Sequence, residues 1–182
     1  MRPGGKKAAA LVTAAAACFA AVACVSASPA EEAAGSAALV VHFVAVEGEP
    51  VVGGRQVGEV FGCADRLVAV DVEETTAAET IEARVTAALA AQFAAKDEAP
   101  EGLYDSLARS VLRVDRVEPV PALPGAYRVH LGGNLRLGGA CDTPRVREQL
   151  EATATQFPEV EMVEIFLGDE PLDAAMAARG RE

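Results

Sequence analysis

Two segments of the chain have helical periodicity with a single apolar stripe each, and this pattern restricts the fold most strongly. In the first segment, four apolar residues recur every four positions: Ile81, Val85, Leu89 and Phe93. Thr76 and Glu79 have the spacing of a capping box, in which the Thr76 side chain caps the N3 amide of the helix and the Glu79 side chain reaches back to the amide of Thr76. The pattern predicts an amphipathic helix of about five turns that ends near Lys96.

The second helical segment has the stronger start signal. Thr143 can cap the helix, and Pro144 suits the first helical position, where no amide donor is needed. Pro158 ends the segment. One face holds Val146, Leu150, Thr153 and Phe157.

Short β-branched and apolar runs surround the two helices and predict five strands. These runs are residues 39–46, 67–72, 111–117, 127–131 and 160–167. Two amphipathic helices need one apolar surface each, which one mixed sheet can supply. The sequence therefore predicts an α+β fold, a two-layer sandwich in which a mixed, mostly antiparallel sheet carries both helices on one face. The domain spans residues 38–172, and residues 173–182 are predicted to be a frayed, Ala-rich tail.

The amino-terminal residues have the layout of an export signal. A basic start is followed by 17 uncharged residues, positions 8–24, and no acidic residue precedes Glu31. Residues 1–23 are therefore predicted to be a signal peptide, with an uncleaved membrane anchor as the alternative. Small residues precede Cys24, so Cys24 is the predicted lipidation site, although ordinary cleavage after Ala27 would fit as well.

Residues 24–37 are predicted to be a flexible tether of small residues. The expected location is the extracytoplasmic side of a membrane, as an anchored lipoprotein. A soluble secreted or periplasmic protein is the alternative.

The cysteine count after export predicts a disulfide. Cys18 lies in the signal, and Cys24 is either lipidated or removed, which leaves Cys63 and Cys141 in an oxidising compartment. The alternative is a pair of unrelated buried thiols. A zinc site would need four ligands, which two cysteines without a nearby histidine do not provide.

Charge and aromatic content exclude some functions. The 182 residues include 16 Lys+Arg against 27 Asp+Glu, a formal charge of −11, which argues against nucleic-acid binding. The absence of Trp and the presence of only two Tyr give little support to a glycan-binding site.

Three stretches resemble the GerMN domain of spore-germination proteins, sporulation proteins and exported bacterial lipoproteins. They are residues 62–70 (GCADRLVAV), residues 110–114 (SVLRV) and the run that begins CDTPR at Cys141 and continues through Gln149-Leu150, Thr153 and Gln156-Phe157-Pro158. The resemblance covers residues 38–172. It implies a small envelope α/β domain, often behind a lipoprotein signal, with no catalytic residues. The sporulation member carries two such domains, whereas this chain has one.

Candidate catalytic groups are few. Ser106 or Ser110 could pair with His42 or His130, but no Gly-x-Ser-x-Gly turn surrounds either serine. His42 is expected to be a hydrogen-bonded core residue and His130 a solvated one. Residues 132–139 are Gly-rich but lack the ending of a phosphate loop, so two turns around a short strand at 135–137 are expected. We expect no enzymatic activity, no cofactor and no metal.

Asp65, Asp142 and Arg145 would lie around the predicted disulfide. They form either a possible interaction surface or a local capping arrangement at the positive end of the helix dipole. The predicted function is that of a non-enzymatic envelope lipoprotein that binds another protein or copies of itself. A module for cell-wall glycan or another envelope ligand is the alternative, and a hydrolase is a third hypothesis.

Overall fold

The computed structural model describes residues 37–179, apart from Val52 and Ala77. The predicted signal peptide, the lipidation site Cys24 and all but the last residue of the predicted tether lie outside the described residues. The strands are β1 (Ala37–Ala45), β2 (Arg55–Phe61), β3 (Asp65–Thr76), β4 (Val111–Pro119), β5 (Ala126–Asn134), β6 (Met162–Leu167) and β7 (Glu170–Pro171). The helices are α1 (Ile81–Ala94), α2 (Asp142–Ala154) and α3 (Leu172–Arg179), with a short 3₁₀ turn η1 (Ala95–Asp97) after α1.

The strands form two sheets. One is fully antiparallel in the order β1-β3-β2, and the other has the order β4-β5-β6-β7 with a parallel β5–β6 pair. Helix α2 is the crossover that a parallel pair requires. The predicted α+β class is confirmed, although two sheets take the place of the single predicted sheet.

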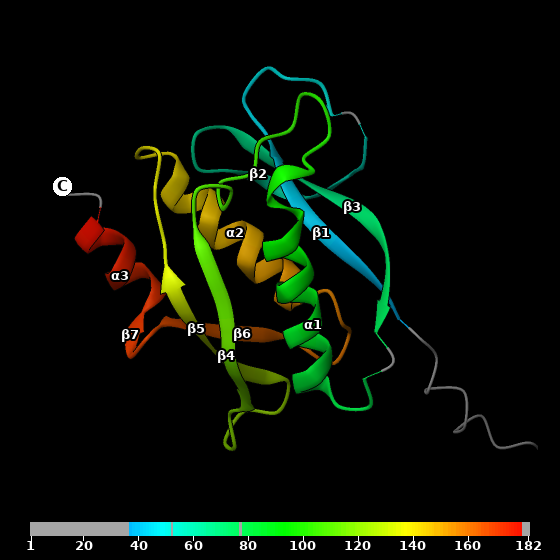
Figure 1. Cartoon of the computed structure of the whole chain (residues 1–182), viewed down its shortest axis with the longest axis vertical. Coiled ribbons are helices and arrows are strands. Elements are labelled where there is room, and N and C mark those ends of the chain that lie inside the picture. Colours follow the sequence, from blue (N-terminus) through cyan, green and yellow to red (C-terminus); the bar gives the residue numbers. More distant parts are fainter. Residues whose placement is uncertain (1–36, 52, 77, 180–182) are drawn as a thin grey trace, which may run out of the picture. The chain divides into compact units, whose positions relative to one another are not determined.

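Helices α1 and α2 join the two sheets through one core (Figure 1). Each contacts β1 of the first sheet, while α1 also contacts β4 and α2 contacts β6 of the second. Fully buried side chains from both helices and both sheets meet there, among them Phe43, Leu89, Leu131 and Leu150. Burial of this shared apolar surface is the main force that holds the sheets together.

Both predicted helices exist, but their first residues differ from the prediction. Thr76 is the last residue of β3, and the N-cap of α1 is Thr80, whose Oγ1 accepts a hydrogen bond from the amide of Ala83 at 3.2 Å. The capping box at Thr76 and Glu79 was therefore wrong, because β3 continues to pair with β1 through Thr76. Helix α2 starts at Asp142 without a side-chain cap, so Thr143 lies inside the helix.

Helix α3 (Leu172–Arg179) corrects the prediction of a frayed tail for residues 173–179, while residues 180–182 of that predicted tail lie outside the described residues. Leu172, Ala175 and Met176 are buried, since the spacing of three and four residues places them on one face toward the core.

Strand β2 was not predicted, because most of its side chains are exposed and show no apolar alternation. Residues 135–137 form no strand, and the preceding glycines belong to β5.

Candidate functional site

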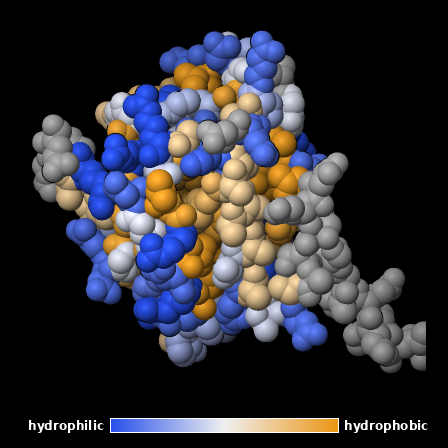
Figure 2. Space-filling model, in the orientation of Figure 1, coloured by the Kyte–Doolittle hydropathy of each residue, from blue (hydrophilic) through white to orange (hydrophobic). Residues whose placement is uncertain are grey.

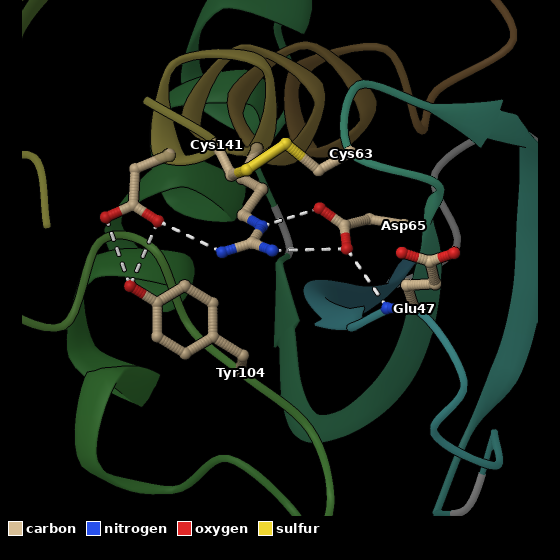
Figure 3. The surroundings of a disulfide bond; sticks show 7 residues. Glu47, Cys63, Asp65, Tyr104 and Cys141 are labelled. Carbon is tan, nitrogen blue, oxygen red and sulfur yellow. Dashed lines mark hydrogen bonds and ion pairs between the residues drawn. A yellow bond between two sulfur atoms is a disulfide. The ribbon is translucent and has the colours of Figure 1, made fainter. Parts of the chain in front are cut away.

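A disulfide joins the turn between β2 and β3 to the start of α2 (Figure 3). The Cα atoms of Cys63 and Cys141 lie 5.8 Å apart, within the range that a disulfide needs. The predicted bridge is confirmed. The turn is tight: Gly62 has φ +50°, and a Cβ there would lie 2.6 Å from Cγ of Pro144, so a glycine lets the turn pack directly on α2.

A buried ion pair lies beside the disulfide and links the same two segments. Arg145 on α2 binds Asp65 on β3 through two hydrogen bonds, Nε–Oδ2 at 2.6 Å and Nη2–Oδ1 at 3.2 Å. The Asp65 side chain is fully buried, and its Oδ1 also accepts from the amide of Glu47 at 3.2 Å. Hydrogen bonding to Asp65 raises the pKa of Arg145, which stays charged. The two-pronged geometry is the arrangement that guanidinium and carboxylate groups favour.

Asp142 extends this cluster toward the loop before β4. Its carboxylate accepts from the amide of Gly138 at 2.5 Å and from the hydroxyl of Tyr104 at 3.1 Å. It also lies 3.4 Å from Nη1 of Arg145, whose guanidinium is 5.2 Å from the centre of the Tyr104 ring. Burial, followed by the charge of Asp142, raises the pKa of Tyr104.

The structure therefore brings Asp65, Asp142 and Arg145 together, as expected from their places around the bridge. They do not form an exposed interaction surface, because both carboxylates are buried and Arg145 is largely covered. The surface interpretation was wrong for these three residues. Their carboxylates and guanidinium satisfy one another and hold the β2–β3 turn against α2.

Glutamine side chains close one edge of β1. Gln92 of α1 accepts from the amide of His42 at 2.7 Å and donates to its carbonyl at 3.0 Å. Gln156, after α2, makes the same two bonds with Val40 at 2.9 and 3.1 Å. Val44 exchanges two backbone hydrogen bonds with Tyr104, both 2.8 Å long. The edge is thus paired at alternate residues without a neighbouring strand.

His42 is the centre of a wider buried network. Its Nδ1 lies 3.0 Å from the hydroxyl of Thr153, and its carbonyl also accepts from Gln149 at 2.6 Å. Burial lowers the pKa of His42 to about 4, and the charge of Arg55 acts in the same direction. The expectation of a hydrogen-bonded core histidine is confirmed.

The sequence analysis missed these buried glutamines, although a signal was present. Gln92 follows Leu89 by three residues and Ala88 by four. Gln149 follows Val146 by three. A polar residue at such a position on an apolar stripe must find partners inside the protein.

The structure does not bring the candidate catalytic serines to a histidine. Ser106 bonds to Gln149, and Ser110 bonds to the backbone of Arg136. His130 stacks on Phe166 with 5.0 Å between ring centres, and its side chain is 12 % exposed, so it is less solvated than expected. Among the described residues, no group of acidic, histidine or cysteine side chains has a metal-binding arrangement.

A hollow of about 520 Å³ lies between the first sheet and α2. We call it the β2–α2 groove. Its apolar lining includes Val40, Val57, Phe61, Leu67, Ala152 and Phe157, and its charged residues are Arg55, Glu59, Arg84 and Glu148. Strand β2 forms one side, and the disulfide and the Asp65–Arg145 pair hold the adjacent turn on α2. The cluster therefore fixes the two sides of the groove relative to each other.

A second apolar surface lies along α1. Figure 2 shows a pale orange band over this helix, with deeper orange on both sides of it. A hollow of about 410 Å³ between α1 and β3 has mostly apolar lining, including Val70, Val72 and Ala94, and only Asp71 and Glu98 are charged.

Comparison with known proteins gives no relative: no family model, no curated protein and no solved structure matches this chain. In the part of the chain that the structure describes, no helix combines the length and the apolar character needed to span a bilayer.

Proposed function

We propose that this chain is a non-enzymatic binding protein of the bacterial cell envelope, exported and attached to the membrane by lipid on Cys24. Its folded part is proposed to be a GerMN-like domain. The observation that carries the proposal is the Cys63–Cys141 disulfide, a bond that persists in oxidising compartments outside the cytoplasm. An amino-terminal segment with the layout of a secretory signal supports the same location.

The residues that carry the GerMN resemblance have structural roles in this protein. Cys141, Asp142 and Arg145 belong to the disulfide cluster, while Gln149, Thr153 and Gln156 surround β1. These side chains make contacts within the fold, which supports a binding function over a hydrolytic one.

The β2–α2 groove is the proposed binding surface, and its proposed occupant is a segment of another envelope protein that inserts apolar side chains. An apolar centre with charged groups of both signs at its edge is the usual composition of a protein–protein interface. A hollow of this size accepts one or two anchoring side chains. A glycan has weaker support, since the aromatic residues of the lining are only Phe61 and Phe157 among the described residues.

Site-specific photo-crosslinking in the native host tests the binding surface. A photoreactive residue at Glu148, inside the groove, is expected to give one discrete product with an envelope protein. The same residue at Asp169, in the turn before β7, is the position control and is expected to give none. Equal products from both positions would overturn the groove as the binding surface.

A steric variant sharpens this experiment. Ala152→Arg places a long side chain in the groove and should abolish the crosslink from position 148. The matched variant Ala174→Arg adds the same side chain on the exposed face of α3 and should leave the crosslink intact. Sedimentation of the protein with purified cell wall, without any protein crosslink, would favour the glycan alternative.

Membrane attachment has its own test. Cys24→Ala should release the protein into the soluble fraction or leave it unprocessed. Unchanged fractionation, together with no lipid mass on the amino terminus, would contradict the lipoprotein proposal.

A further inference from the structure

A hollow of about 510 Å³ lies where the turn before β4, the loop after β5 and the end of α3 meet. We call it the arginine pocket, after Arg109, Arg136 and Arg179. The remaining lining residues are Asn134, Leu135 and Leu137. No acidic side chain lines it, although the chain has 27 acidic residues against 16 basic ones.

The three arginines differ from most others in the described part of the chain because they have no carboxylate partner there. Six other arginines make ion pairs with Asp or Glu: Arg84, Arg113, Arg116, Arg128, Arg145 and Arg147. Among the described residues, the pocket arginines make no such pair. Three cations that share one hollow repel one another, and a bound anion would remove that repulsion.

The backbone that carries the pocket is held in place by the fold. The amide of Arg136 donates to Oγ of Ser110 at 3.0 Å, which ties the loop after β5 to the residue next to Arg109. Leu135 is 2 % exposed and anchors the same loop in the core. Nη1 of Arg179 donates to the carbonyl of Ala175 at 2.8 Å, so one nitrogen positions the side chain while other donors remain. A site whose elements are already ordered loses less entropy when a ligand binds.

We propose that the arginine pocket binds a phosphate group. Guanidinium groups from three separate chain segments suit a tetrahedral, multiply charged anion, whose oxygens point in several directions. A carboxylate would occupy one guanidinium and leave the other two uncompensated. The phosphate can belong to a soluble phosphate ester or to an anionic lipid headgroup. This site shares no lining residue with the β2–α2 groove and is independent of the function proposed for that groove.

Titration of the purified domain tests the pocket with two probes. The soluble probe is glycerol phosphate, followed by calorimetry or by NMR of the arginine side chains. The membrane probe is a vesicle of phosphatidic acid, whose phosphate is a monoester, and phosphatidylcholine, compared with phosphatidylcholine alone. The variants are Arg136→Gln and Arg109→Gln, and the matched control is Arg66→Gln, which removes an arginine that lines neither the pocket nor the β2–α2 groove.

Each pocket variant is expected to weaken binding about tenfold, as for the loss of one charge-assisted hydrogen bond. The control should stay within twofold of the unmodified protein, and added salt should weaken binding further. Binding of glycerol phosphate would assign a soluble source, and binding of the anionic vesicle alone would assign a headgroup. Absence of binding to both probes, or an equal loss in Arg66→Gln, would overturn the proposal. Thermal melting of each variant separates loss of the site from loss of the fold.

Discussion

The side-chain amide of Gln92 pairs with the backbone of His42 as a neighbouring β-strand would, accepting from the amide and donating to the carbonyl. Gln156 repeats this arrangement two residues earlier, at Val40. The free edge of β1 therefore has no unsatisfied backbone group at either position. This closure explains why the second sheet does not continue from the first.

Replacement of Gln92 by Leu should destabilise the protein by about 2 kcal/mol, because the buried amide of His42 loses its only acceptor among the described residues. The carbonyl of His42 keeps its bond from Gln149. Urea unfolding measures the change. Gln56→Leu, at an exposed position on β2, is the control and should change stability by less than about 0.5 kcal/mol.

Asp65→Ala should lower the free energy of unfolding by about 3 kcal/mol. It leaves the largely buried guanidinium of Arg145 beside the Tyr104 ring, with Asp142 at 3.4 Å as its remaining carboxylate partner among the described residues. The comparison is Asp115→Ala, which breaks an exposed pair with Arg113 and should cost less than about 1 kcal/mol. Similar unfolding free energies for the two variants would contradict a structural role for the buried pair.

Loss of the disulfide should lower stability by about 4 kcal/mol in the chain-entropy model, because the bond closes a loop across 78 positions. The double variant Cys63→Ser, Cys141→Ser should keep its circular dichroism spectrum but melt at a lower temperature. Two reactive thiols in protein purified from its native compartment would show that the bridge does not form there.

Stability should fall as the pH is lowered from about 6.5 to about 4. The unfolded chain protonates His42 near its ordinary pKa of 6.5, whereas the folded protein holds that pKa at about 4. Protons therefore bind the unfolded state more readily in this pH range. The stabilisation that depends on neutral His42 is complete above pH 6.5. Protonation of His42 in the unfolded chain lowers the free energy of unfolding by roughly 3 kcal/mol across this pH range. Unfolding of His42→Gln over the same pH range should show a shallower slope, and an equal slope would refute the assignment.

Helix α3 should be part of the cooperative fold. Met176→Ala removes a fully buried side chain and should cost about 2–4 kcal/mol. Met162→Ala is the matched control, since Met162 is 45 % exposed on β6. Denaturant unfolding of both variants gives the comparison, and equal, small effects would show that α3 is frayed after all.

Periodicity predicted the elements that bury an apolar face, and it failed where burial depends on contacts made elsewhere in the chain. Val85 and Leu89 revealed α1 through their spacing, and β1 was evident from its β-branched run. Strand β2 has only two partly buried residues, and half of the residues of α3 are alanine, so neither had a clear pattern.

The cluster around the disulfide shows the same limit. The cysteine count predicted the bridge, and the bridge placed Asp65 and Asp142 near each other. The burial of Asp142 could not be foreseen, because Asp142 lies against Tyr104 and the loop at Gly138, which the local sequence does not connect to it. The arginine pocket likewise joins three segments that are distant along the chain.

The separation of Cys63 and Cys141 also imposes an order of events on a chain that emerges from a channel with its amino terminus first. The β2–β3 hairpin is complete soon after Cys63 appears, yet its cysteine must wait as a thiol until 78 further positions have passed. During that interval the hairpin has no α2 to pack against. Under the proposed export, oxidation would follow the arrival of Cys141 outside the cytoplasm, and a product truncated before residue 141 cannot acquire this bond.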